Sequence, residues 1–247
     1  MLRLHPQLRA GGRGCHIGAV RPAPALLAAA ALTLSACSSL TPAAVALPAP
    51  LATHAPELVE GLGVGRDGSF AVGAAQGTFK RGRDRLELFD IVSWDSAKTR
   101  YEVTLADGAR TEAACRGSAV EISWRVLAAN VKPFSFDCEW RGAKSASMAL
   151  RAPALAAGLK AERSGRFTMN GLMLEVQSLH TVQGSPLPLD APIGYLLSHE
   201  GRPVGAIELN GTTPRLWRPD AGHALHEPVT LAALALALLW DPSDRAP

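Results

Sequence analysis

The stretch P-V-T-L-A-A-L-A-L-A-L-L-W, residues 228 to 240, decides the fold of this 247-residue chain. It consists of good helix formers, it begins with a proline that a first helical turn accepts, and Asp241-Pro242 would end it. Thr230 is its only polar side chain, so the predicted helix has no face suited to water and needs burial on every side. Thirteen residues rise only about 20 Å, against roughly 30 Å for the hydrocarbon layer of a bilayer. We therefore predict a core helix over 228–240, with a second membrane anchor as the weaker alternative.

The chain before this helix alternates between apolar and polar residues, which is typical of β-strands with one buried face. The pattern predicts inward side chains at Val120, Ile122, Trp124 and Val126 in one run, and at Phe134, Phe136, Cys138 and Trp140 in the next. Further runs with this period cover 101–105, 172–176 and 205–209. Turn-forming residues at 106–108, 163–165, 199–201 and 210–211 separate the strands. Short loops of this kind favour antiparallel pairing.

Many short strands then have to surround one short apolar helix. A sheet that closes on itself removes its edges and buries the helix from all directions. The predicted fold class is mainly β: an antiparallel closed or nearly closed barrel of about 9–12 strands around a buried hydrophobic C-terminal helix. In this order of elements, over residues 68–240, the chain resembles the tubby-like and phospholipid-scramblase-like barrels. The resemblance is one of architecture, and it implies no binding residue.

The N-terminal residues have the layout of a signal peptide. Arginines precede an apolar run at 25–34 that is too short to span a bilayer. The run ends in Leu34-Ser35-Ala36-Cys37, which resembles the lipobox of bacterial lipoproteins. That resemblance implies cleavage before Cys37, acylation of its thiol, and, because serine follows it, the periplasmic face of the outer membrane. The alternative is an ordinary secretory cleavage that leaves Cys37 as a thiol.

Two further cysteines remain in the mature chain, Cys115 and Cys138. An oxidising periplasm would let them form one disulfide, worth roughly 3 kcal/mol of stability in the chain-entropy account. Two free buried thiols are the alternative. Neither cysteine belongs to a C-x-x-C pair, so we predict no zinc site.

The predicted organisation has three parts: a signal peptide at 1–36, a lipidated Ala/Pro-rich tether at 37–57, and a single β-rich periplasmic domain at 58–247. Removal of the signal peptide takes away four arginines and leaves 21 basic against 22 acidic side chains. A near-neutral chain gives no electrostatic footprint for nucleic acid, so we expect no nucleic-acid partner.

Candidate catalytic residues are few. His223 and His226 stand beside Glu227 and could serve a metal if the stretch were helical, but we interpret it as the loop entering the last helix. His199 is interpreted as part of a hairpin tip, and His180 as a core or rim histidine with its hydrogen bonds satisfied. The sequence holds no G-x-S-x-G, H-E-x-x-H, Walker or dinucleotide-binding pattern. We predict no enzyme, no catalytic residue, no metal and no cofactor.

The body also resembles uncharacterised proteobacterial lipoproteins in the phrases L-F-D-I, G-Y-L-L-S-H-E-G-R-P-V-G-A-I-E-L and A-L-A-L-L-W-D-P. That resemblance implies no activity. We predict a membrane-anchored periplasmic lipoprotein that acts as a non-enzymatic binding or structural module of the envelope, with an envelope protein as a candidate partner. The alternatives are a carrier of a lipid or small hydrophobic ligand and, third, a periplasmic hydrolase built from two or more of the four histidines.

Overall fold

Strands dominate the computed structural model, which describes residues 44–88, 92–124, 127–153 and 161–241. The helices are α2 (Ala49–Ala52) and α3 (His226–Ala237). The strands are β1 (Glu57–Leu58), β2 (Asp67–Val72), β3 (Ala75–Leu88), β4 (Val92–Thr104), β5 (Arg110–Trp124), β6 (Leu127–Gly142), β7 (Ala146–Arg151), β8 (Ser164–Met169), β9 (Leu172–Leu179), β10 (Gly194–His199), β11 (Arg202–Glu208) and β12 (Arg215–Trp217).

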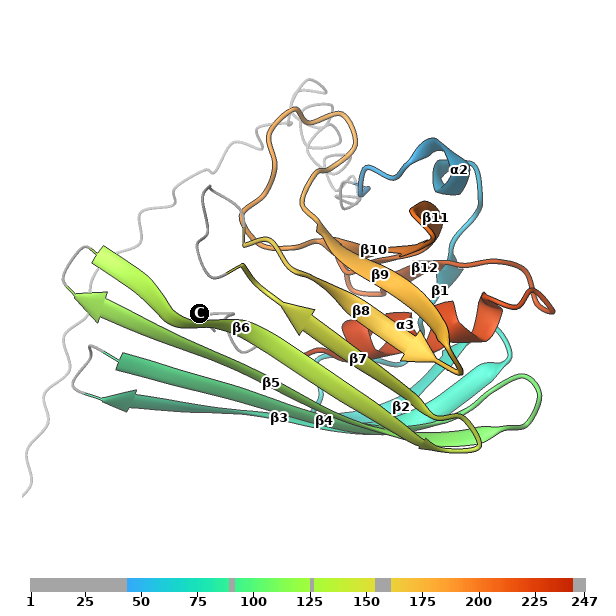
Figure 1. Ribbon diagram of the computed structural model, residues 1–247, viewed down its shortest axis with the longest axis horizontal. Helices are drawn as coiled ribbons and strands as arrows, with labels where there is room; N and C mark the ends of the chain where they lie inside the picture. The colour runs from blue at the N-terminus through green and yellow to red at the C-terminus, as the bar shows by residue number, and fades with distance from the viewer. Residues whose placement is uncertain (1–43, 89–91, 125–126, 154–160, 242–247) are drawn as a thin grey trace, which may run out of the picture. The chain divides into compact units, whose positions relative to one another are not determined.

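All twelve strands belong to one sheet, and each pairs antiparallel with its neighbours in the order β1-β12-β11-β10-β9-β8-β7-β6-β5-β4-β3-β2. The two ends of this order meet just after β1, where Glu60 and Ala71 of β2 exchange backbone hydrogen bonds of 2.9 and 3.1 Å. The sheet therefore curls into a barrel that closes through a single bridge (Figure 1). The predicted antiparallel barrel of about 9–12 strands is confirmed.

Helix α3 lies inside this barrel (Figure 1). Every side chain from Val229 to Leu236 is at most 1% exposed, including the polar Thr230. The helix packs against β8, β10 and β11, and the Tyr101 hydroxyl of β4 donates to the Leu231 carbonyl at 3.3 Å. The prediction of a buried, all-apolar helix is confirmed. In the described part of the chain, no helix is both long and apolar enough to cross a membrane.

The boundaries of this helix differ from the predicted 228–240. It starts two residues earlier, at His226, because Pro228 sits within the first turn, where backbone N–H groups have no helical partner. It ends at Ala237, because the chain turns away at Leu238 and runs out over β3 and β4. There the Trp240 ring lies 5.4 Å from the Arg81 guanidinium, and Arg83 donates to the Asp241 carbonyl at 3.1 Å. The residues that follow the helix thus contact β3 and do not continue α3 to Trp240.

Strands β3 to β6 are longer than the barrel needs. Strand β2 pairs with β3 only as far as Lys80, and β7 pairs with β6 only from Ser135 onward. Beyond these points β3, β4, β5 and β6 pair only with one another and extend past the barrel as a four-stranded sheet, drawn in green (Figure 1). Two of the predicted inward residues, Ile122 and Trp124, belong to this extension, and their side chains lie outside the described part of the structure. A third, Val126, lies outside the described residues.

Cys115 and Cys138 form the predicted disulfide. The two residues stand directly opposite each other on β5 and β6, with their Cα atoms 4.0 Å apart. Both are 2% exposed, and Phe134, Phe136 and Trp140 on the same face of β6 are also buried, as the alternation predicts. The disulfide therefore joins the two strands on the core side of the sheet.

Three of the four predicted turns fall between strands, and the turn at 163–165 is wrong. Ser164 and Gly165 begin β8 instead. A side chain at Gly165 would overlap the Ala149 carbonyl of β7, so the glycine serves a close approach of two strands rather than a turn.

Residues 44–52 are packed against the barrel, although we expected a tether as far as residue 57. Val45 bridges Val182, and its N–H donates to a carboxylate oxygen of Glu208 at 3.0 Å. Glu208 is 1% exposed and pairs with Arg215 at 2.7 Å. Val45 and Leu51 cover a second apolar cluster on β10–β12 that includes Trp217.

Candidate functional site

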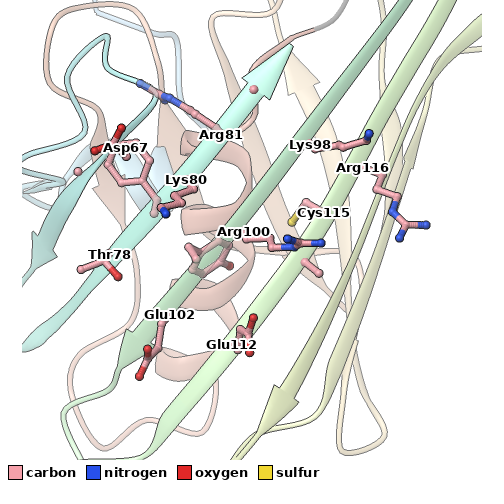
Figure 2. Close-up of a pocket in the computed structure, with 15 residues that line it drawn as sticks. Asp67, Thr78, Lys80, Arg81, Lys98, Arg100, Glu102, Glu112, Cys115 and Arg116 are labelled. Carbon is pink, nitrogen blue, oxygen red and sulfur yellow. The ribbon is translucent and has the colours of Figure 1, made fainter. Parts of the chain in front are cut away.

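Four basic side chains gather on the outer face of β3, β4 and β5 (Figure 2). The strand register sets them in two adjacent rows of directly opposed residues, Lys80–Arg100–Ala114 and Gly82–Lys98–Arg116. Neighbouring strands lie about 4.8 Å apart and successive rows about 7 Å apart, so four positive charges share a small area. We call this group, Lys80, Lys98, Arg100 and Arg116, the basic cluster.

The basic cluster lines an open cleft of about 1160 Å³. Each row combines two long cations with one small residue, Ala114 in the first and Gly82 in the second. A Cβ atom added at Gly82 would have no atom within 4 Å, so the glycine leaves open space rather than meeting a packing need. The small residues create the hollow, and the cations stand around it.

The four cations of the cleft are not ion-paired, although the carboxylate residue Asp67 of β2 stands directly opposite Lys80. Lys80 faces Arg100 and Lys98 faces Arg116, and like charges placed directly opposite each other destabilise a sheet. Among the described residues, none of the four makes an ion pair. Asp137 stands opposite Arg116 but binds Arg151 at 2.6 Å instead. An anion in the cleft would relieve this repulsion.

Acidic residues border the cleft on two sides, with Asp67 on β2 and a glutamate pair on β4 and β5. Glu102 and Glu112 are direct partners in the next row toward the barrel end, and Glu102 pairs with Arg110 at 3.2 Å. Arg81 forms the wall at the β2 side, where its guanidinium donates to the carbonyls of Leu62 and Gly63 at 3.1 and 2.6 Å. Burial lowers the pKa of Arg81 from its ordinary value. Arg81 thus holds a loop and is not part of the basic cluster.

Two large apolar side chains continue the same outer face beyond the basic cluster. Leu86 and Trp94 are direct partners on β3 and β4 and are 56% and 52% exposed. Monomeric proteins expose single apolar residues commonly, but paired exposed ones beside a cation cluster are typical of a contact surface. The outer face therefore offers both charge and apolar area.

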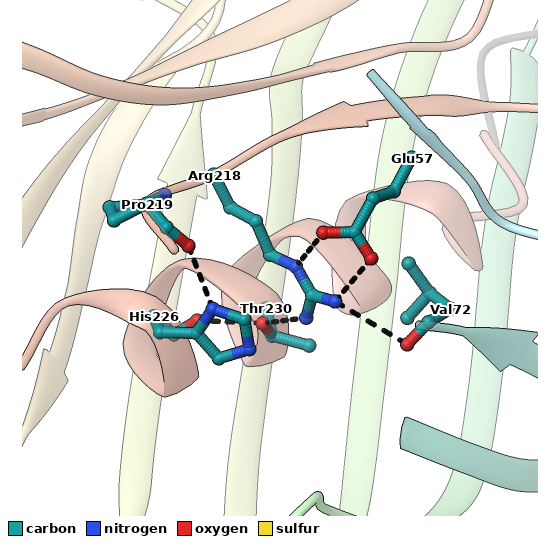
Figure 3. A network of polar contacts seen from close by, with 6 residues as sticks. All are labelled: Glu57, Val72, Arg218, Pro219, His226 and Thr230. Atoms are coloured by element: carbon teal, nitrogen blue, oxygen red, sulfur yellow. Dashed lines mark hydrogen bonds and ion pairs between the residues drawn. The ribbon is translucent and has the colours of Figure 1, made fainter. Parts of the chain in front are cut away.

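A second polar group closes one end of the barrel and is structural (Figure 3). Arg218 donates to both carboxylate oxygens of Glu57 at 2.9 and 2.5 Å and to the Thr230 hydroxyl at 2.6 Å. Thr230 donates to the His226 carbonyl at 2.6 Å. The hydrogen bond from Arg218 is the main cause that lowers the pKa of Glu57 below its ordinary 4.5. These contacts join β1, the residue after β12, and α3.

A third polar group lies where β9 leaves the barrel. The Ser178 hydroxyl is 2.9 Å from Nε2 of His180, and Nδ1 of His180 donates to the Leu189 carbonyl at 3.0 Å. The Ser178 oxygen also accepts the Arg163 N–H at 2.9 Å. Ser178 is 9% and His180 6% exposed, so both are buried with their hydrogen bonds made. The interpretation of His180 as a satisfied core histidine is confirmed.

The other histidines support local structure. His226 binds the Pro219 carbonyl at 2.7 Å through Nδ1, and His223 accepts the Leu225 N–H at 3.1 Å. These two line one hollow of about 470 Å³ with Glu227. We expected the whole stretch in the loop before the helix, but His226 and Glu227 form the start of α3, because the helix begins two residues before Pro228. His199, at the β10–β11 hairpin, binds the Met173 carbonyl at 2.9 Å. The described residues contain no group of three or more His, Cys, Asp or Glu suited to hold a metal ion.

Sequence reasoning missed the basic cluster. Its signal is present as cations two residues apart, in Lys98 and Arg100 on β4, and as Lys80 followed two residues later by Gly82 on β3. Only the register of three strands brings Arg116 beside them. Cys37, the predicted lipidation site, lies outside the described residues.

Comparisons with protein-family models, with curated proteins and with solved structures found no match for this chain.

Proposed function

We propose that this protein is a membrane-anchored periplasmic lipoprotein that acts as a non-enzymatic binding module of the envelope, and that it binds an anionic ligand in the cleft of the basic cluster. The resemblance of residues 34–37 to a lipobox supports an anchor at Cys37, on the periplasmic face of the outer membrane. The observation that carries the binding role is the pair of like-charge contacts, Lys80–Arg100 and Lys98–Arg116, in which no cation makes an ion pair with a described residue. Repulsion between these cations lowers the stability of the folded protein, and a bound anion would offset that repulsion.

The occupied interior argues against a carrier of a lipid or small hydrophobic ligand. Such a carrier needs an enclosed apolar cavity of several hundred cubic ångströms. Here α3 fills the barrel, and its side chains from Val229 to Leu236 are at most 1% exposed. A ligand therefore has to bind outside the barrel, where the cleft of the basic cluster lies.

The dispersed histidines argue against a hydrolase. His180, His199 and the pair His223 and His226 occupy three separate places in the fold. Each of them uses Nδ1 in a hydrogen bond to its own surroundings. Their hydrogen bonds hold loops and helix α3, and this arrangement favours a structural use of each imidazole.

A substitution at Gly82 tests the binding role. Glutamate at Gly82 places a carboxylate among the four cations, and its Cβ atom would have no atom within 4 Å. We expect the affinity for inorganic tripolyphosphate, measured by isothermal titration calorimetry at low salt, to fall at least about tenfold, since one repulsive contact at this distance is worth on the order of 1–2 kcal/mol. Thr168→Glu, an exposed position of β8, is the control for charge alone. Equal binding by Gly82→Glu and the unchanged protein would refute the anion site.

The anchor is tested separately. We expect incorporation of an alkyne-labelled palmitate in cells, and its loss in Cys37→Ala. Labelling that persists in Cys37→Ala would refute acylation at this residue.

A further inference from the structure

The loop between β9 and β10 exposes two leucines. Leu187 is 73% and Leu189 44% exposed, and in the loop, residues 180–193, Asp190 is the one Asp, Glu, Lys or Arg. The loop is nevertheless fixed in place. Leu189 donates its N–H to the His180 carbonyl at 2.7 Å, and its own carbonyl accepts from the His180 ring at 3.0 Å. Pro186 and Pro188 further limit the backbone. The hydrogen bonds to His180 and the two prolines therefore fix the loop in a conformation that leaves both leucines exposed to solvent.

The described chain begins beside this loop. The Gln183 N–H donates to the Ala44 carbonyl at 2.7 Å, and Val45 bridges Val182. Seven peptide units separate Cys37 from Ala44, and a fully extended chain of that length spans at most about 25 Å. An acyl chain on Cys37 would keep the β9–β10 loop within that distance of the bilayer surface.

We propose that Leu187 and Leu189 enter the interface of the membrane that holds Cys37 and act as a second contact beside the lipid anchor. This inference rests on the proposed function, because it needs the acylated cysteine. A lipid surface is the occupant that the loop fits. It offers apolar contact to the uncharged segment 180–189, which ends just before Asp190, and the short connection from Cys37 keeps this segment close to the membrane.

Contact of Leu187 and Leu189 with the membrane also sets the orientation of the basic cluster relative to that membrane. In the ring of twelve strands β10 and β4 are six places apart, so they lie on opposite sides of the barrel. Figure 1 shows the β9–β10 loop, in orange, and the start of the described chain on the side away from β3 and β4. With Leu187 at the membrane, Lys98 and Arg100 face away from it, toward the periplasm. The anionic ligand would then approach from the periplasmic space.

Site-specific fluorescence tests this contact. The acylated full-length protein, extracted from cells in detergent, carries an environment-sensitive nitrobenzoxadiazole dye at Leu187→Cys and is reconstituted into phosphatidylethanolamine–phosphatidylglycerol vesicles. The control is Met173→Cys, at the other end of β9 and 42% exposed. We expect the dye at 187 to shift to the blue, gain several-fold in intensity and be quenched by spin-labelled lipid, while the dye at 173 changes little.

Flotation of the same vesicles separates the two proposals. If the protein floats with the vesicles but the dye at 187 keeps the emission that it has in water, the anchor is supported and the loop contact is refuted. Protein that does not float overturns the anchor, and the loop contact that depends on it. Blue-shifted emission at both 187 and 173 also contradicts the proposal, because it would indicate a different orientation on the membrane.

Discussion

Single buried polar groups decide how the helix and the sheet fit together. The Tyr101 hydroxyl accepts the indole N–H of Trp140 at 2.9 Å and donates to the Leu231 carbonyl. Both aromatic side chains are at most 2% exposed. Burial raises the pKa of Tyr101 far above its ordinary 10.0, so the group is a neutral phenol at all physiological pH values. One hydroxyl thus satisfies a donor of β6 and an acceptor of α3.

Removal of that hydroxyl leaves the buried indole N–H of Trp140 without its partner, while the Leu231 carbonyl keeps the hydrogen bond that it accepts within helix α3. We expect Tyr101→Phe to lower the free energy of unfolding by about 1–3 kcal/mol, because an orphaned buried polar group costs about that much. Urea denaturation at pH 7 measures it. An unchanged midpoint with an unchanged slope would show that the hydrogen bonds contribute nothing.

At the scale of elements, Gly205 sets how closely β11 approaches α3. A Cβ atom at this position would stand 2.5 Å from a methyl carbon of Val229 and 2.9 Å from the Trp217 carbonyl. Neither neighbour can move easily, because Val229 is fully buried in the helix and Trp217 belongs to β12. The absence of a side chain is therefore a packing requirement.

Gly205→Ala should destabilise the protein by about 1–3 kcal/mol, the usual effect of overpacking a core. Gly82→Ala is the matched control, since the added methyl group meets nothing within 4 Å. Thermal unfolding of both variants measures the difference. Equal melting temperatures would contradict the close approach of β11 and α3.

The contact of Glu57 with Arg218 makes one end of the barrel sensitive to pH. The folded-state pKa of Glu57 is lowered, so its stabilising effect is present above the ordinary value of 4.5 and is lost as pH falls through the folded-state pKa. The Glu57 side chain is 41% exposed, so solvent screens the ion pair and its contribution is about 1 kcal/mol.

We expect Glu57→Gln to be less stable than the unchanged protein at pH 7 and equally stable below the folded-state pKa. Urea midpoints from pH 7 down to pH 3 measure this convergence. Glu175→Gln, at an exposed position of β9, should differ from the unchanged protein at neither end of the range. A gap for Glu57→Gln that stays constant down to pH 3 would contradict the account.

Local patterns predicted the elements well where one physical requirement dominates. Phe134, Phe136 and Trp140 alternate because β6 has one buried face, and α3 is apolar all round because it is buried all round. The basic cluster was not predictable, because Arg116 meets Lys98 only through the pairing of β4 with β5. The docked segment at 44–52 depends on Glu208, a residue 163 positions away, and no local pattern encodes that contact.

At the scale of the whole molecule, the filled barrel separates two outer surfaces. The side of β9 and β10 receives the start of the described chain and carries the exposed Leu187. The side of β3 to β5 carries the basic cluster. Because α3 fills the space between them, neither surface has access to an interior cavity. Both proposed contacts, with lipid and with an anion, are therefore made on the outside of the barrel.

Hydrogen exchange of the α3 backbone tests that central claim most directly. A helix enclosed by a closed sheet can exchange its amides only when the barrel opens. Mass spectrometry with residue resolution should find the amides of residues 231–236 among the slowest in the protein, with protection equal to the free energy of global unfolding. Exchange of these amides faster than those of β9 and β10 would mean that the helix leaves the barrel without unfolding it, and would contradict the account.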